Sequence, residues 1–218
     1  KKLTQLLIDY SLDKADDDKS WDISKDLNDF ARVLLNEDDV KHFRKLADKE
    51  LDDFFELKKK LQGANKEIEA TYSKLGNEVL SFIESSGISS TDFAQTGELV
   101  KHFKKLRNLR FLKSEDLKFD GRLDATIKGC KNLFAAKASP ATKQAIEEIS
   151  DRLRQYYLES KEVYNATFSD YLLNKITLKS IIPLAVLNNI NTELNTIKED
   201  NNIRLNAEFN QLISDNIK

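Results

Sequence analysis

Few residues in this 218-residue chain have the chemistry of a catalytic or metal site. The sequence contains two histidines, His42 and His102, and one cysteine, Cys130, which lie far apart along the chain. It contains no glycine-rich phosphate loop, no HExxH zinc motif, no CxxC pair and no GxSxG nucleophile turn. A zinc site built from these residues would need mostly carboxylates, which is unusual. We therefore predict no enzymatic activity, no metal site and no cofactor.

Acidic side chains are plentiful, but their spacing does not bring them together. The neighbours Asp52 and Asp53, and likewise Glu147 and Glu148, fall on expected helices and point in different directions. Carboxylate metal sites in helical bundles usually carry a Glu-x-x-His pair, which this sequence lacks. We expect these acids on solvent-exposed helix faces.

Hydrophobic residues recur in steps of three or four over most of the chain, which is the spacing of amphipathic helices. The strongest stripe runs from Phe43 to Phe82 with a mean step of about 3.5 residues, a value that keeps one face of a long helix against a partner. It predicts one helix of about 45 residues. Gly63 and Gly76 fall inside this helix, and Gly87 is suited to the left-handed conformation that ends one.

Two further long helical regions follow. The first extends over about 98–136 with an expected bend at Gly121, and the second begins after Pro140 and continues almost to the end. Pro183 is expected to kink or interrupt it, because proline lacks the amide donor and clashes with the preceding turn. Only six glycines and two prolines are present, and no alternating strand pattern occurs.

These patterns predict an all-α fold: an elongated antiparallel bundle or coiled coil of three long helices plus short N-terminal helices. Residues 1–40 are expected to form the short helices and an acidic tether, and residues 41–218 the long-helix bundle.

Charge is unevenly distributed although the net charge is only −2, a value that gives no reason to expect a nucleic-acid partner. The basic stretch from Lys101 to Lys113 alternates with apolar residues, a pattern that suits an anionic lipid surface. The alternative is an ordinary solvated helix whose apolar side is core. The lipid-binding candidates in and beyond this stretch are Lys101, Lys104, Lys105, Arg107, Arg110, Lys113, Lys128, Lys131 and Lys137.

One run in the last helical region is apolar on every side, which indicates burial on more than one face. Burial against a second copy of the chain would explain it, and so would the centre of a bundle formed by one chain. The dimer-interface candidates in this run are Ile181, Ile182, Leu184, Val186 and Leu187.

Location is indicated by the same composition. A single cysteine cannot form an intrachain disulfide, which favours a reducing compartment. No signal peptide or membrane span is visible, because the most apolar stretch, 171–190, is interrupted by polar residues and Pro183. We expect a cytoplasmic protein that is peripheral on membranes.

From about Lys104 onward the pattern resembles the second and third helices of BAR domains. The residues that carry the likeness are Leu117-Lys118-Phe119-Asp120, the Ser139-Pro140 turn and the long third helix through 145–148, 158–162 and 168–172, with 42–84 as the first helix. The resemblance implies a crescent-shaped homodimer that senses or shapes curved anionic membranes in trafficking. It would bind them through basic residues on its concave face and near its tips, where Lys128, Lys131 and Lys137 would lie.

Two other functions remain open from the residues alone. The chain could be a helical scaffold or tether that binds other proteins through its acidic N-terminal part, which includes Asp16, Asp17 and Asp18. It could also be a cysteine-poor helical surface antigen or adhesin.

Overall fold

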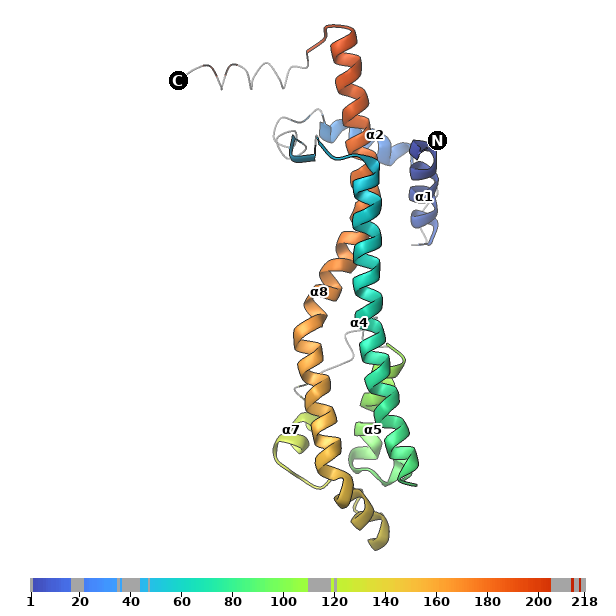
Figure 1. Ribbon diagram of the computed structural model, residues 1–218, viewed down its shortest axis with the longest axis vertical. Coiled ribbons are helices and arrows are strands. Elements are labelled where there is room, and N and C mark those ends of the chain that lie inside the picture. The colour runs from blue at the N-terminus through green and yellow to red at the C-terminus, as the bar shows by residue number, and fades with distance from the viewer. Residues whose placement is uncertain are drawn as a thin grey trace. The chain divides into compact units, whose positions relative to one another are not determined.

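The computed structural model of the chain describes residues 2–16, 22–34, 36, 44–46, 48–109, 119, 121–204, 213 and 216. The predicted all-α class is confirmed. Within the described residues, extended pairing is limited to one isolated antiparallel bridge between Phe93 and Phe134. The α-helices are α1 (Lys2–Asp16), α2 (Ser24–Leu34), α4 (Leu51–Ser85), α5 (Ala94–Arg107), α7 (Arg122–Lys128) and α8 (Pro140–Asp200), with 3-10 turns η1 (Arg44–Leu46) and η2 (Ser90–Asp92) (Figure 1).

The chain divides into two compact units. Unit 1 comprises 1–62 and 174–218, and unit 2 comprises 63–173, so the long helices α4 and α8 each contribute to both. This division differs from the boundary predicted near residue 41. The difference arises because the predicted short helix α1 packs in the same apolar core as the second half of α8.

In unit 2 the helices α4 and α8 run antiparallel. The Tyr171 hydroxyl donates to the Glu69 carboxylate at 2.7 Å, whereas the Tyr156 hydroxyl donates to Glu78 at 2.9 Å. The later residue of α4, Glu78, thus pairs with the earlier residue of α8, Tyr156, as an antiparallel arrangement requires. Between these bonds Tyr72 is fully buried and its hydroxyl meets the Thr167 hydroxyl at 3.0 Å.

Helix α5 packs unusually close to α4. A Cβ atom placed on Gly76 would lie 2.5 Å from the Arg107 backbone nitrogen and 2.9 Å from the Phe103 carbonyl oxygen. Only glycine, which has no side chain, permits this approach. The Ser73 hydroxyl donates to the Arg107 carbonyl at 3.1 Å and holds the end of α5 at the same place.

The region 98–136 does not form the one long helix predicted for it. Its described part contains α5 and the short α7, and Leu109 and Cys130, which follow these helices, have left-handed φ angles of 53° and 46°. Both helices turn apolar residues toward one core. Two short helices therefore produce the same recurrence of apolar residues every three or four positions as one continuous helix would. Gly121 precedes α7 as its N-cap, in place of the predicted bend.

The first long helix begins at Leu51, later than predicted. Residues 48–50 are not helical, and the Asp53 carboxylate in the first turn of α4 accepts a hydrogen bond from the Glu50 backbone N–H at 2.8 Å, as the N3 residue of a capping box does. Gly87, with φ of 69°, lies just past the end of this helix as predicted. Helix α8 is not interrupted at Pro183, and the kink expected there stays a prediction.

Unit 1 has its own core. Leu6 and Tyr10 of α1 pack with Phe54 of α4 and with Ile181 and Ile182 of α8. An ion pair between Lys14 and Asp26 joins α1 to α2. Burial, followed by the Asp26 carboxylate, raises the pKa of Tyr10 to about 12.

Candidate functional site

The basic side of α5 contains three of the predicted lipid-binding residues in exposed positions. Three cations, Lys101, Lys104 and Arg107, are exposed and follow one another at intervals of three residues, so they lie on one side of the helix. Lys105 is half-buried. Leu99, Phe103 and Leu106, on the opposite side, are buried in the core, and so is Val100.

His102 also lies on the buried side of α5. It is 5% exposed and packs edge-on against Phe119, with the ring centroids 5.2 Å apart. Burial, followed by the charge of Lys105, lowers the pKa of His102 to about 3, so the ring is neutral near neutral pH.

The His102–Ser160 contact does not activate a nucleophile. The Ser160 hydroxyl donates its proton to the Tyr157 carbonyl at 2.7 Å, so His102 Nε2, at 3.0 Å, must be the donor to Ser160. A general base would have to accept that proton instead. Ser160 has no exposed surface, so this pair holds α5 against α8.

Asp124 is the centre of a second polar cluster. Its carboxylate pairs with Lys128 at 2.7 Å and with Lys161 at 2.8 Å, and it accepts the Tyr157 hydroxyl at 3.4 Å. Burial by itself would raise the pKa of Asp124, but the hydrogen bonds and charges of the two lysines outweigh it and lower the pKa. The cluster fastens α7 to α8.

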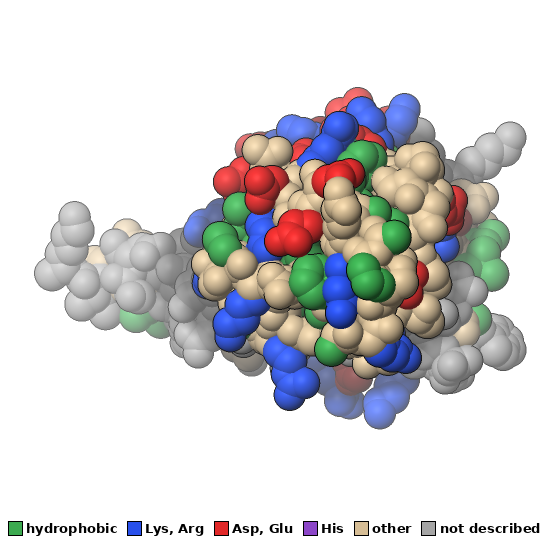
Figure 2. Space-filling model, turned by 90° about the horizontal axis from the view of Figure 1, so that it is seen from below, with side chains coloured by type: hydrophobic (Ala, Val, Ile, Leu, Met, Phe, Trp, Pro, Cys, Tyr) green, Lys and Arg blue, Asp and Glu red, His purple; other side chains and the backbone are tan. Residues whose placement is uncertain are grey.

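The nine predicted lipid-binding residues therefore differ in their freedom to bind a ligand. Lys101, Lys104, Arg107, Lys131 and Lys137 are exposed, whereas Lys128 is committed to Asp124. Arg110 and Lys113 lie outside the described residues, as do His42, Asp17 and Asp18. Figure 2 looks onto the end of unit 2 where α8 begins, and shows Lys and Arg side chains interspersed with Asp and Glu. In that view the basic groups do not form one continuous patch.

The apolar run predicted as a dimer interface is covered within unit 1. Ile181, Ile182, Val186 and Leu187 are at most 7% exposed, and Leu184 is half-buried against the same cluster. The single-chain core therefore accounts for the run. Dimerisation through these residues stays a prediction.

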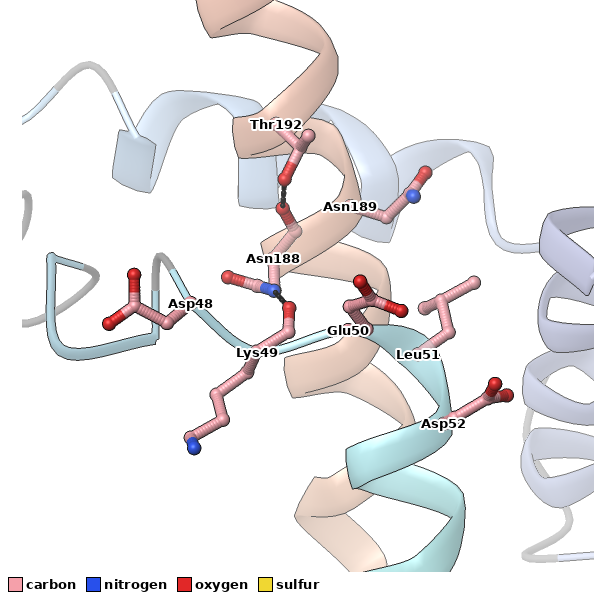
Figure 3. Close-up of a pocket in the computed structure, with 8 residues that line it drawn as sticks. All are labelled: Asp48, Lys49, Glu50, Leu51, Asp52, Asn188, Asn189 and Thr192. Carbon is pink, nitrogen blue, oxygen red and sulfur yellow. Dashed lines mark hydrogen bonds between the residues drawn. The ribbon is translucent and has the colours of Figure 1, made fainter.

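A cavity of unit 1 lies where α4 begins beside α8. It has a volume of about 500 Å³ and is lined by Asp48, Lys49, Glu50, Leu51, Asp52, Asn188, Asn189 and Thr192 (Figure 3). The Asn188 amide donates to the Lys49 carbonyl at 2.8 Å, and its Oδ1 atom is buried without a hydrogen-bond partner.

Neither a metal cluster nor a membrane span is found in the part of the chain that the structure describes. No group of three His, Cys, Asp or Glu side chains there is close enough to hold an ion. No helix there combines the length and hydrophobicity needed to cross a bilayer. Cys130 is a free, exposed thiol.

Sequence reasoning missed several residues that position these surfaces. The Asp124–Lys128 pair has the four-residue spacing of helical ion pairs and was recognisable from it. Lys161 and Gly76 carried no comparable local signal, because their partners come from distant segments. Comparison of the chain with models of protein families, with curated proteins and with solved structures finds no match.

Proposed function

We propose that this chain is a non-enzymatic helical domain that binds anionic membrane surfaces as a homodimer, in the manner of BAR domains. The observation that supports the proposal is that α5 has a buried apolar side and an exposed basic side. Its apolar side is buried in the core of unit 2, and Lys101, Lys104 and Arg107 face solvent in one row. Among the described residues no ion pair to these three cations is found.

The burial of the apolar side determines the mode of binding. Val100, Phe103 and Leu106 are at most 4% exposed, so α5 cannot insert them into a bilayer while it stays packed. Binding must therefore be electrostatic adsorption, which falls off within a Debye length and weakens with salt.

The strength of such adsorption argues for a dimer. Each Lys or Arg near an anionic surface contributes about 1 kcal/mol, so one α5 face contributes roughly 3 kcal/mol. That alone corresponds to a dissociation constant in the millimolar range or weaker. Two copies that present the face together would double the electrostatic contribution.

Vesicle co-sedimentation tests the proposal. The variant Lys101→Gln/Lys104→Gln/Arg107→Gln should lose binding to phosphatidylserine vesicles at low salt. The matched control Lys25→Gln/Lys59→Gln/Lys60→Gln removes the same charge from exposed positions of unit 1 and should keep it. Equal binding of both variants would refute the α5 assignment, and a monomer by light scattering would refute the dimer.

A protein-binding scaffold is the second candidate, and one observation favours it. Ile8 and Leu12 of α1 are 47% and 58% exposed, one turn apart on the side opposite the buried Leu6 and Tyr10. Such side chains suit a protein partner. Two results together would favour this function. The parent chain would not bind vesicles, and the variant Ile8→Ser/Leu12→Ser would lose the self-association or partner binding that the parent chain shows without vesicles.

A further inference from the structure

The cavity between the start of α4 and α8 contains an unused hydrogen-bond acceptor. Asn188 is 4% exposed, and its amide group is held by the Lys49 carbonyl. Its Oδ1 atom has no partner. Figure 3 shows Oδ1 pointing away from the Lys49 carbonyl, toward the side on which Asp48 lies. A buried acceptor without a donor is unfavourable, so a ligand that supplies one would be stabilised there.

The walls of the cavity determine what kind of donor fits. Asp48 and Glu50 are exposed, and no ion pair to either is found among the described residues. Lys49 directs its ammonium group away from Asn188 (Figure 3). A positively charged donor is therefore favoured over a neutral or negative one.

A metal ion is a poor match for the same place. The carboxylates of Asp48 and Asp52 point to opposite sides in Figure 3, and no three acidic, His or Cys side chains in the described residues converge on one point. A volume of about 500 Å³ suits an organic group of amino-acid or polyamine size.

We infer that this cavity binds a cationic nitrogen donor, a guanidinium or an alkylammonium group, with Asn188 Oδ1 as acceptor and Asp48, on the side to which Oδ1 points, as the nearer counter-charge, while Glu50 adds negative charge to the cavity lining. The group could belong to a small molecule or to an Arg or Lys side chain of a protein. Because Oδ1 is buried, the donor reaches it only after side chains at the mouth of the cavity shift. This inference is independent of vesicle binding by α5.

Nuclear magnetic resonance titration of the full chain tests it. The probe is N-acetyl-arginine methylamide, and its neutral counterpart, N-acetyl-citrulline methylamide, has a similar shape without the charge. We expect saturable shifts of the Asn188 side-chain amide and the Lys49 backbone amide with the arginine probe only. Spermidine and an arginine-containing peptide, titrated separately, distinguish a small-molecule ligand from a protein side chain.

Two variants complete the test. Asp48→Asn/Glu50→Gln should weaken binding about tenfold or more, because charge-assisted hydrogen bonds are lost. The control Glu199→Gln/Asp200→Asn removes the same charge from exposed positions at the end of α8 and should not change it. Equal shifts with the arginine and citrulline probes, equal weakening by both variants, or no saturable shift with any cationic probe would overturn the inference.

Discussion

Replacing Gly76 by alanine tests the close contact that positions α5. The new Cβ would lie 2.5 Å from the Arg107 nitrogen and 2.9 Å from the Phe103 carbonyl oxygen, both backbone atoms that cannot rotate away. Ordinary contacts between such atoms are about 3.5 Å or longer, so α5 must move about 1 Å from α4. Phe103 and Leu106, which have no exposed surface, would then lose packing.

The size of the effect follows from two opposing contributions. Overpacking costs about 1–3 kcal/mol, and the upper end applies because backbone must move. Alanine regains about 1 kcal/mol of helix propensity over glycine. We expect Gly76→Ala to lower the free energy of unfolding by about 2 kcal/mol.

Gly63 provides the matched control in the same helix. A Cβ at Gly63 would meet no atom within 4 Å, so Gly63→Ala should raise the free energy of unfolding by about 1 kcal/mol. Urea unfolding followed by circular dichroism measures both variants, and amide exchange in α5 locates the change. A Gly76→Ala protein as stable as Gly63→Ala would refute the proposed contact.

Other consequences of the structure can be measured in the same way. Because the pKa of His102 is lowered from 6.5 to about 3, this residue does not destabilise the folded state above pH 6.5, and below that it lowers the free energy of unfolding by up to about 1.4 kcal/mol per pH unit as the pH falls toward 3. His102→Gln should flatten this dependence in urea unfolding at several pH values, and an unchanged slope would contradict the burial of a neutral ring. Asp124→Asn should lower the free energy of unfolding by about 2 kcal/mol, less than the loss of a fully buried ion pair, because the Lys128 side chain is 62% exposed. An unchanged free energy of unfolding in calorimetry would show that the cluster does not stabilise the fold. Ile182→Ala should cost about 2–4 kcal/mol because Ile182 has no exposed surface, whereas Ile176→Ala, at a position 65% exposed, should cost little; equal losses would exclude the proposed core.

Local patterns in the sequence were sufficient to predict the long helices α4 and α8, but not the division between α5 and α7 or the contacts between helices. The stripe through Phe54, Leu61 and Leu75 predicted most of α4, and Gly87 marked its end because a left-handed stop is a local property. Periodicity could not separate α5 from α7, since two short helices on one core repeat the pattern of a long one.

Gly76 illustrates what a single sequence hides. In the sequence it is a residue that weakens a helix, and its role becomes visible only when Arg107, 31 positions later, is placed beside it. The basic side of α5 was predictable from residue types, because cations and apolar residues alternate at helical spacing. The sequence did not predict which of these cations form ion pairs. Lys128, for example, pairs with Asp124, which also pairs with the distant Lys161.

The resemblance to BAR domains remains a prediction about function. Two of its expected long helices correspond to α4 and α8, whereas the described part of the middle one contains the shorter α5 and α7. The proposal of membrane binding therefore depends on the exposed cations of α5 rather than on the helix lengths.

The most direct measurement is the partition coefficient of the chain on phosphatidylserine vesicles, compared between the parent protein and Lys101→Gln/Lys104→Gln/Arg107→Gln at low and high salt. If α5 is the lipid contact, three charges at about 1 kcal/mol each predict a difference of roughly a hundredfold at low salt that shrinks as salt is added. Equal partitioning of the two proteins, or a difference that salt leaves unchanged, would contradict the account.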